Sequence, residues 1–308
     1  MKIELYQTWH DEHSYPEDST GLLPFDCRKN PEFHKRESAH LIRLYDEVIQ
    51  KSDIESYFGL LSPKFSDKSK ISIEQIKRHI TENPDYDIYL FNPFPLLTYQ
   101  NLNVWTHGES KHSGIMDLAQ HLFNKAEFPI NIKERHRNNL ENTVYCNYWV
   151  ASKKFFDDYI KVIKKLDLII ENMPHSDKNK YFSETTYCTT ACFYPFIFER
   201  IICSFLLLNK HYNVKPYIYN HHSHIFNGSK KINRKFYERE LHIHFDSWEK
   251  SIADLDKIEY GINFVQNTLN PQLPKSSIKF IDKVVESTYK RIRISHLKTE
   301  LMKINHNS

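Results

Sequence analysis

The stretch that decides the fold is YFGLLSPKFSDKSKISIEQIKRHITENPDYDIYLFNPFP, residues 57–95. Residues 57–61 form a short apolar run that Ser62-Pro63 ends, and residues 87–91 form a second one that Asn92-Pro93 ends. Between the runs, isoleucines recur at helical spacing behind Ser72, a residue suited to the start of a helix. Two strands joined by a helix predict a βαβ unit, and therefore an α/β fold whose sheet is covered on both faces.

Ligands of open α/β sheets bind at the carboxyl ends of the strands. The first predicted strand is followed by Ser62, Lys64 and Lys68, and the second is followed by Asn92. These residues are therefore expected at one edge of the sheet, where they could contact an anionic or polar ligand.

The rest of the chain predicts further elements in order. Before residue 57 we expect a strand at 3–9, a long polar loop at 10–30 and a helix at 32–51. After residue 95 we expect a strand at 101–106, a loop at 107–114, a helix at 115–126, a strand at 145–151, a helix capped by Ser152 and a polar linker at 173–180. The last part is expected to contain an apolar helix at 196–208, a strand at 215–219, an edge strand at 240–245 and a basic helical end. A change in composition predicts two parts, residues 1–220 and 221–308.

Composition excludes several classes of function. A net charge of +3 over 308 residues is too small to indicate a nucleic-acid partner. The 6 glycines form neither a P-loop nor a GxGxxG motif. An odd number of irregularly spaced cysteines and an N-terminus interrupted by charge and His predict a cytoplasmic protein. The most apolar segment, 191–208, carries Glu199 and Arg200, which predicts a buried helix rather than a membrane span.

Three groups of residues carry chemistry that the pattern singles out. Asp85 and Asp87 stand one residue apart, and two such carboxylates can hold a divalent metal ion against a diphosphate. The alternative is a solvated turn after Pro84, because the pair precedes its strand. The segment from His107 to His112, which includes Glu109, suits a loop that binds phosphate through Lys111 and His112 or supplies a catalytic base; the alternative is an ordinary surface loop.

Glu199 and Arg200 are the strongest local anomaly, since both lie in an otherwise apolar helix. Buried charges are costly unless they are paired or bind a ligand. The two residues either pair within the core or line one wall of a cleft that faces a sugar or phosphate.

The order of five short blocks resembles that of bacterial glycosyltransferases of capsule and lipopolysaccharide O-chain assembly, which have a GT-A-like fold. The blocks are KNPEFHKRES (29–38), YFGLLSPKF (57–65), DIYLFNP (87–93), NYWVASKKFFDDY (147–159) and FYPFIFERIICSFLL (193–207). Related proteins carry a His-Tyr-Arg-Arg type of loop where this chain has Ser62-Pro63-Lys64-Phe65, and no D-x-D motif follows a strand here.

The resemblance implies transfer of a sugar from a nucleotide-sugar donor to a glycan or lipid-linked acceptor. Glu199, Glu109 and His107 are then the candidate catalytic bases, and Asp85 and Asp87 the candidate ligands of Mn²⁺ or Mg²⁺. The expected donor-binding residues are Tyr6, Asp26, Asn30, Lys64, Lys68, Asn92, His112 and Arg200.

Two further alternatives stay open. The chain could instead be a non-catalytic nucleotide- or sugar-binding partner in an assembly complex; an enzyme requires that Glu199, Glu109 and Asp87 converge on one cleft. A metal-dependent hydrolase that uses the His-rich segments lacks clean ligand spacing. The basic residues within 275–303 predict either an amphipathic helix on the inner face of the membrane or a helix packed on the main domain.

Overall fold

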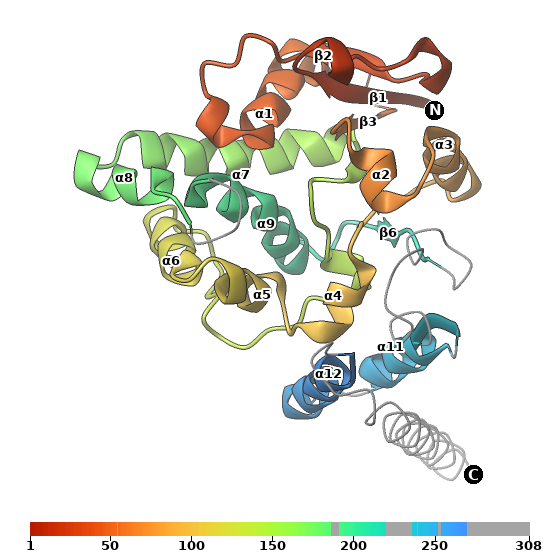
Figure 1. Cartoon of the computed structure of the whole chain (residues 1–308), viewed down its shortest axis with the longest axis vertical. Coiled ribbons are helices and arrows are strands. Elements are labelled where there is room, and N and C mark those ends of the chain that lie inside the picture. The colour runs from red at the N-terminus through yellow and green to blue at the C-terminus, as the bar shows by residue number, and fades with distance from the viewer. Residues whose placement is uncertain (54, 186–190, 220–235, 239, 252–253, 270–308) are drawn as a thin grey trace. The chain divides into compact units, whose positions relative to one another are not determined.

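The computed structural model describes residues 1–53, 55–185, 191–219, 236–238, 240–251 and 254–269 (Figure 1). The chain divides into two compact units, and each is described by itself. The first unit comprises Met1–Thr98 and Asn103–Ile218, and the second comprises Tyr99–Leu102 and Tyr219–Ser308.

A six-stranded sheet forms the centre of the first unit, in the order β2-β1-β3-β5-β4-β6. Its strands are β1 (Lys2–Trp9), β2 (Leu23–Asp26), β3 (Ser56–Leu61), β4 (Ile88–Leu90), β5 (Trp149–Ser152) and β6 (Val214–Pro216). The predicted strands at 3–9, 57–61, 87–91, 145–151 and 215–219 are confirmed within a few residues, whereas β2 lies in the segment predicted as a loop. The prediction of an α/β fold is therefore confirmed.

The sheet is mixed rather than wholly parallel. The two strands of the predicted βαβ unit, β3 and β4, are not neighbours, because β5 lies between them and runs antiparallel to both. Gly59 of β3 permits this close pairing, since a Cβ atom there would come within 2.9 Å of a Val150 methyl group on β5. The periodicity of one strand carries no information on which distant segment pairs with it, so the sequence could not predict this insertion.

Alternate residues of each strand face opposite sides of the sheet. On one side, Phe58 and Leu60 of β3 join a core with α1 (Glu37–Glu47), α7 (Lys153–Glu171) and α9 (Phe193–Leu208). On the other side, α3 (Ile73–Glu82) buries its isoleucines, and its His79 ring packs against Tyr89 of β4. Figure 1 shows α1 and α3 on opposite sides of β3.

Capping residues fix where two long helices begin. Ser72 and Gln75 form a capping box at the start of α3, and the Ser152 hydroxyl accepts a hydrogen bond from the Phe155 N–H at the start of α7. Both N-caps were predicted and are confirmed. The remaining helices of this unit are α2 (Phe65–Ser69), α5 (Val104–Lys111), α6 (Ile115–Lys125), α8 (His175–Phe182) and the short 3₁₀ turns η1 (Glu12–Ser14), η2 (Asp18–Thr20), η3 (Phe33–Lys35), η4 (Ile49–Lys51) and η5 (Leu140–Asn142). The helix α4 (Pro95–Gln100) begins in this unit, and its last two residues belong to the second.

Three predicted segments between residues 101 and 180 are wrong. The strand at 101–106 and the loop at 107–114 are replaced largely by α5, and the linker at 173–180 is largely α8. Asn103 starts α5 by a capping box with Thr106, which overrides the β propensity of its first residues. Gly108 did not break this helix, because its bare Cα lets the Arg200 guanidinium pack against the helix; a Cβ there would lie 2.8 Å from Arg200 Nε.

The second unit is helical where it is described. It contains α11 (Leu241–Ser251) and α12 (Leu255–Leu269), so the predicted edge strand at 240–245 is wrong. The Tyr99 hydroxyl donates to Asp246 at 3.0 Å, and the Tyr99 ring contacts Phe245, which ties Tyr99–Leu102 into this unit. The basic residues of 275–303 lie outside the described residues.

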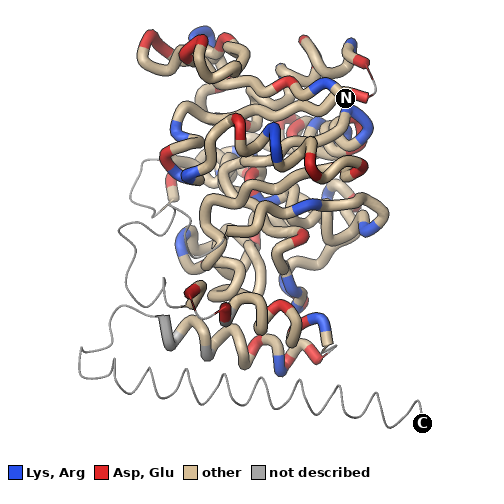
Figure 2. The backbone as a smooth tube through the Cα atoms, turned by 90° about the vertical axis from the view of Figure 1, so that its right-hand side faces the viewer, with Lys and Arg blue, Asp and Glu red and all other residues tan. Residues whose placement is uncertain are grey.

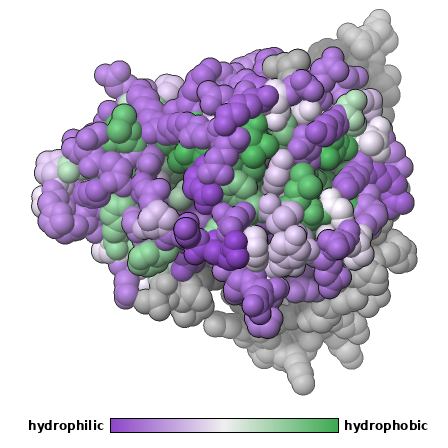
Figure 3. Space-filling model, turned by 90° about the horizontal axis from the view of Figure 1, so that it is seen from above, coloured by the Kyte–Doolittle hydropathy of each residue, from purple (hydrophilic) through white to green (hydrophobic). Residues whose placement is uncertain are grey.

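The surface of the described residues is mixed in character. Figure 2 shows Lys and Arg interspersed with Asp and Glu along the backbone, and Figure 3 shows hydrophobic patches set among mostly hydrophilic residues on one face. Among the described helices, none has both the length and the apolar character needed to cross a lipid bilayer.

A buried lysine ties the start of α1 to the rest of the first unit. Lys35 is 2% exposed, and its ammonium lies 2.6 Å from a Glu32 oxygen and 2.9 Å from oxygens of both Asp167 and Glu171 on α7. Burial alone lowers the pKa of Lys35, but these three carboxylates outweigh it, so the net shift is upward. The charged network therefore fixes the chain just before Glu37.

We expect Lys35→Met to lower the free energy of unfolding by up to about 3 kcal/mol, because three partly solvated carboxylates then lose their shared cation. Urea unfolding followed by circular dichroism measures this change. Lys161→Met is the matched control: among the described residues its exposed ammonium pairs with Asp158 alone, so its loss is expected to cost less than about 1 kcal/mol. Equal costs for the two variants would contradict a structural role for the Lys35 network.

Candidate functional site

The order of the strands defines a place where a ligand can enter. From β1 the chain passes to β2 on one side, and α1 then carries it back across to β3 on the other side. All three strands are parallel, so their carboxyl ends lie at one edge. The two connections leave β1 and β3 in different directions, and ligands of open α/β sheets bind in the crevice formed at such a switch point.

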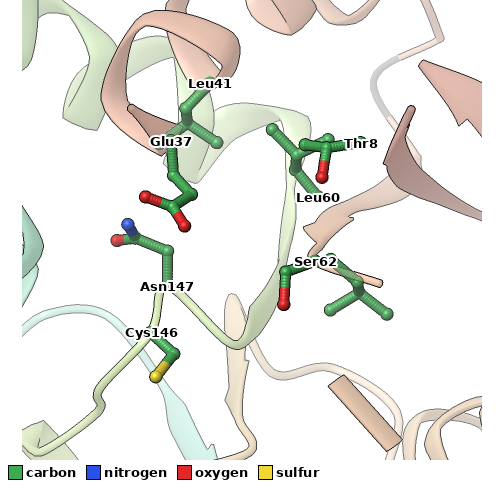
Figure 4. A pocket seen from close by; sticks show the side chains of 8 residues that line it. Thr8, Glu37, Leu41, Leu60, Ser62, Cys146 and Asn147 are labelled. Carbon is green, nitrogen blue, oxygen red and sulfur yellow. The ribbon is translucent and has the colours of Figure 1, made fainter. Parts of the chain in front are cut away.

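A small hollow lies at this edge (Figure 4). Its enclosed volume is about 10 Å³, roughly the space of one water molecule, and about 260 Å³ of open space lies around its mouth. It therefore holds at most one small group of a ligand, such as a hydroxyl, and the rest of the ligand would lie over its mouth. Its lining residues come from β1, α1, the end of β3 and the turn before β5: Thr8, Glu37, Leu41, Leu60, Leu61, Ser62, Cys146 and Asn147.

The turn that closes the hollow has an unusual backbone. Cys146 and Asn147 have φ angles of 62° and 52°, in the left-handed region that residues other than glycine seldom adopt. The turn is held at Tyr148, whose hydroxyl lies 2.7 Å from the Ser62 hydroxyl and whose ring packs on Phe65. Strained backbone of this kind concentrates at functional sites, where the surrounding structure holds it in place.

Figure 4 shows the Glu37 carboxylate near the Asn147 amide on one side of the hollow, with Thr8 and Ser62 on the other side. Lys68 of α2 approaches the same turn, with its ammonium 3.6 Å from the Cys146 thiol. The hollow is thus bordered by a carboxylate, an amide, a hydroxyl at Ser62 and a cation. These groups can hydrogen bond to the hydroxyls of a sugar and to the oxygens of a phosphate.

Glu199 of α9 adds a second carboxylate next to the turn. Burial is the main cause that raises the pKa of Glu199, and the Glu37 carboxylate raises it further. Arg200, a backbone hydrogen bond from Cys146 and Lys68 act in the opposite direction, but the net shift is upward. A carboxyl group with a raised pKa, beside a hollow, is typical of a general acid or base.

Arg200 does not lie next to the turn at Cys146 as Glu199 does. It is 3% exposed, and its guanidinium donates to the carbonyls of Val104 and Phe196 at 3.0 and 2.7 Å. Successive residues of a helix point about 100° apart, so Glu199 and Arg200 face different surroundings. Arg200 holds α5 against α9, and the expected role in donor binding gains no support from these contacts.

The predicted loop residues serve the packing of helices. Both carboxylate oxygens of Glu109 accept backbone N–H groups at the start of α6, from Gly114 at 2.7 Å and Met116 at 3.1 Å. His107 lies 3.0 Å from the Tyr145 hydroxyl. His112 is 3% exposed, stacks on Phe196 and lies 3.1 Å from the Thr185 hydroxyl.

Burial is the first cause that lowers the pKa values of His107 and His112 to about 4, and the nearby Arg200 lowers them further. Both rings are therefore neutral at pH 7. A neutral, buried His112 lacks the charge that binding a phosphate was expected to use.

The proposed metal ligands lie at the other edge of the sheet. Asp87 directly precedes β4, and its carboxylate accepts the Asn213 N–H at 2.8 Å. Asp85 stands in the turn before it, with a φ angle of 68°. Because β4 is parallel to β1 and β3, its amino end is remote from the hollow, and a metal ion there would not contact a ligand in it.

The expected donor-binding residues are spread over several places. Tyr6 is buried in β1 and donates to Glu4, while Thr8, two residues further along the same face, lines the hollow. Asp26 is exposed and pairs with Arg28, which is the first cause that lowers its pKa to about 2. Asn30 lies 3.4 Å from His40.

Two predicted residues stand at carboxyl ends of strands, as expected. Lys64 is the N-cap of α2 just after Ser62-Pro63. Asn92 follows β4, is 8% exposed, and accepts the Phe94 N–H, while its buried Nδ2 has no hydrogen-bond partner among the described residues.

Glu199, Glu109 and Asp87 therefore do not converge. Of the residues singled out from the sequence, Ser62 lines the hollow, and Lys68 and Glu199 lie next to its lining residue Cys146. The other residues that line the hollow are not among the sites predicted from the sequence: Thr8, Glu37, Leu41, Leu60, Leu61, Cys146 and Asn147. A signal was present for Glu37, Leu60, Leu61 and Asn147, because they belong to the blocks at 29–38, 57–65 and 147–159; nothing in the sequence distinguishes Cys146 from other loop residues.

The strained turn gives a stability prediction. Asn147→Gly is expected to leave the urea midpoint unchanged or higher, and Asn147→Val to lower the free energy of unfolding by about 1–2 kcal/mol, because a β-branched residue is strained at this φ angle. Asn172→Val is the control, since Asn172 has a φ angle of −92°. Indistinguishable stabilities for the Gly and Val variants at 147 would show that the turn is not strained.

Comparison of the chain with protein-family models, with curated proteins and with solved structures found no match.

Proposed function

We propose that the chain is a glycosyltransferase that moves a sugar from a nucleotide-sugar donor to a cell-surface glycan acceptor of the capsule or lipopolysaccharide type. The observation that carries the proposal is the hollow at the switch point between β1 and β3, bordered by Glu37, Lys68 and the raised-pKa carboxyl of Glu199.

Each of these groups suits one part of such a transfer. In an inverting reaction, Glu199 takes the proton of the acceptor hydroxyl while the hydroxyl oxygen attacks the anomeric carbon of the donor sugar. The bond from that carbon to the diphosphate breaks, and Lys68 offsets the negative charge of the leaving group. Glu37, Ser62 and Asn147 hydrogen bond to sugar hydroxyls and hold the ring for attack.

The fold is compatible with this proposal. A mixed sheet flanked by helices on both faces is what the resemblance to GT-A-like enzymes implies, and the hollow lies where the sheet order predicts ligand binding. Fold alone does not establish function, so the proposal depends on the charged groups around the hollow.

A specific observation favours the second candidate, a non-catalytic nucleotide- or sugar-binding partner. Glu109 caps α6 and Asp87 lies at the other edge of the sheet, so only one of the three carboxylates expected in an active cleft lies near it. The binding protein and the enzyme both bind the donor, and they differ in turnover.

We expect the protein to be stabilised by a subset of uridine, guanosine or cytidine nucleotide sugars, by about 2.7 kcal/mol at a ligand concentration of 100 Kd. Glu199→Gln is expected to keep the parent's melting temperature and to lower the rate of transfer by about 10²–10⁴-fold. Glu82→Gln is the matched control, because Glu82 is an exposed carboxylate at the end of α3. Stabilisation without measurable transfer by the parent would favour the binding protein, and no stabilisation by any nucleotide sugar would contradict both.

The two carboxylates also give a prediction for pH dependence. Only the deprotonated form of Glu199 acts as a base, so the transfer rate is expected to fall as the pH drops through its raised pKa. Glu37 contributes to raising that pKa, so Glu37→Gln is expected to shift this fall in rate, the acid limb of the pH–rate profile, to lower pH. Rates of donor turnover between pH 4 and 8 measure the limb. A limb that stays in place, or moves to higher pH, would show that the two carboxylates are not coupled.

A further inference from the structure

Three potential metal ligands meet at the edge of β1 and β2. Trp9 pairs with Asp26 where these parallel strands end, so the next residues, His10 and Cys27, leave the sheet side by side. The Cys27 N–H donates to the Trp9 carbonyl at 2.8 Å, which continues the pairing by one residue. His40 of α1 completes the group, and one ligand atom from each of His10, Cys27 and His40 lies within 4.8 Å of the other two.

Two of the three side chains are buried, so the protein holds them in place whether or not a ligand is bound. Cys27 and His40 are each 2% exposed, whereas His10 is exposed to solvent. The His40 Nε2 lies 3.4 Å from the Asn30 side-chain amide, but its buried Nδ1 has no hydrogen-bond partner among the described residues. A buried imidazole nitrogen without a partner costs free energy, and a metal ion would satisfy it.

We propose that His10, Cys27 and His40 bind a zinc-class transition metal ion through two imidazoles and one thiolate. Tetrahedral zinc places such ligand atoms roughly 3.3–3.7 Å apart, so the group must contract by about 1 Å. The exposed His10 side chain can make this movement, while Cys27 and His40 are held by the sheet and by α1.

The donor set also decides which metal ions fit. A thiolate and imidazoles favour Zn²⁺ and Co²⁺ over Mg²⁺, Ca²⁺ and Mn²⁺, which prefer oxygen ligands. Three protein ligands leave a fourth position for water, since His10 is exposed to solvent. The site is therefore chemically different from the oxygen-ligated metal expected on Asp85 and Asp87, and the inference goes beyond the proposed function.

Asn30 has a defined part in this arrangement. Metal-bound imidazoles usually give the N–H of their second nitrogen to an oxygen acceptor, which fixes the orientation of the ring. With the metal on His40 Nδ1, the Nε2–H would donate to the Asn30 side-chain carbonyl, which only requires that the amide be turned over. Asn30 is thus a positioning residue for His40.

The test uses Co²⁺ as a probe, because its thiolate complexes absorb in the near ultraviolet and its tetrahedral complexes absorb in the visible. Full-length protein stripped by a chelator is titrated with Co²⁺ and then with Zn²⁺. We expect one equivalent of Co²⁺ to give both sets of bands and Zn²⁺ to remove them. Mg²⁺ and Mn²⁺ are expected not to compete.

The variants locate the site. Cys27→Ser is expected to abolish the thiolate band, His10→Ala to weaken binding by more than about 100-fold, and Asn30→Ala by about 10–100-fold. Cys203→Ser and His13→Ala are the matched controls: the first removes another buried thiol and the second a neighbouring exposed imidazole. Circular dichroism checks that each variant is folded, and His10→Ala tests the site even if Cys27→Ser does not fold.

The proposal is overturned if the parent shows no thiolate band with Co²⁺. It is also overturned if the band survives in folded Cys27→Ser, or if the parent and His10→Ala bind Co²⁺ equally, because the metal ion would then occupy another place such as the His-rich segment at 221–224. None of these readouts depends on sugar transfer, so the metal site and the proposed function can fail separately.

Discussion

The constraint that the rest of the structure depends on is the position of β1 between β2 and β3. The chain leaves this strand toward one side and returns on the other, so the loops at its carboxyl end diverge and leave room for a ligand. Both candidate sites follow from it. The hollow lies at the carboxyl ends of β1 and β3, and the group of His10, Cys27 and His40 lies at the ends of β1 and β2.

Helix α1 connects the two sites. Its first turns carry Glu37 and Leu41 toward the hollow and His40 toward Cys27 and His10. The buried Lys35 fixes the chain immediately before this helix, because its ammonium pairs with Glu32, which precedes η3, and with Asp167 of α7. A charged network in the interior contributes modestly to stability, but it restricts geometry strongly, since any shift leaves charges unpaired. The precision of both sites therefore depends on it.

Local patterns predicted the elements that their own residues specify. The β3-α3-β4 segment, the caps at Ser72 and Ser152, and the apolar helix around Glu199 all follow from short-range periodicity and capping. The errors arose where distant contacts decide the outcome. Residues 104–111 are helical although Gly108 lies among them, because the Arg200 side chain from α9 fills the space that a Cβ would take. Glu109 has a side chain suited to catalysis, but as the sixth residue of α5 it accepts hydrogen bonds from the start of α6 instead.

The sequence by itself determined that the chain is α/β, that strands end in polar residues such as Ser62, and that a carboxylate at 199 lies in an apolar helix. Only the tertiary structure decided that β5 separates β3 from β4, that Arg200 turns away from Glu199, and that Glu37 comes beside Glu199 across α1 and α9. The physical reason is the separation along the chain between the residues that interact. Periodicity and capping act over a few residues, whereas the strand pairing, burial and electrostatic coupling described here join residues roughly 60 to 160 positions apart.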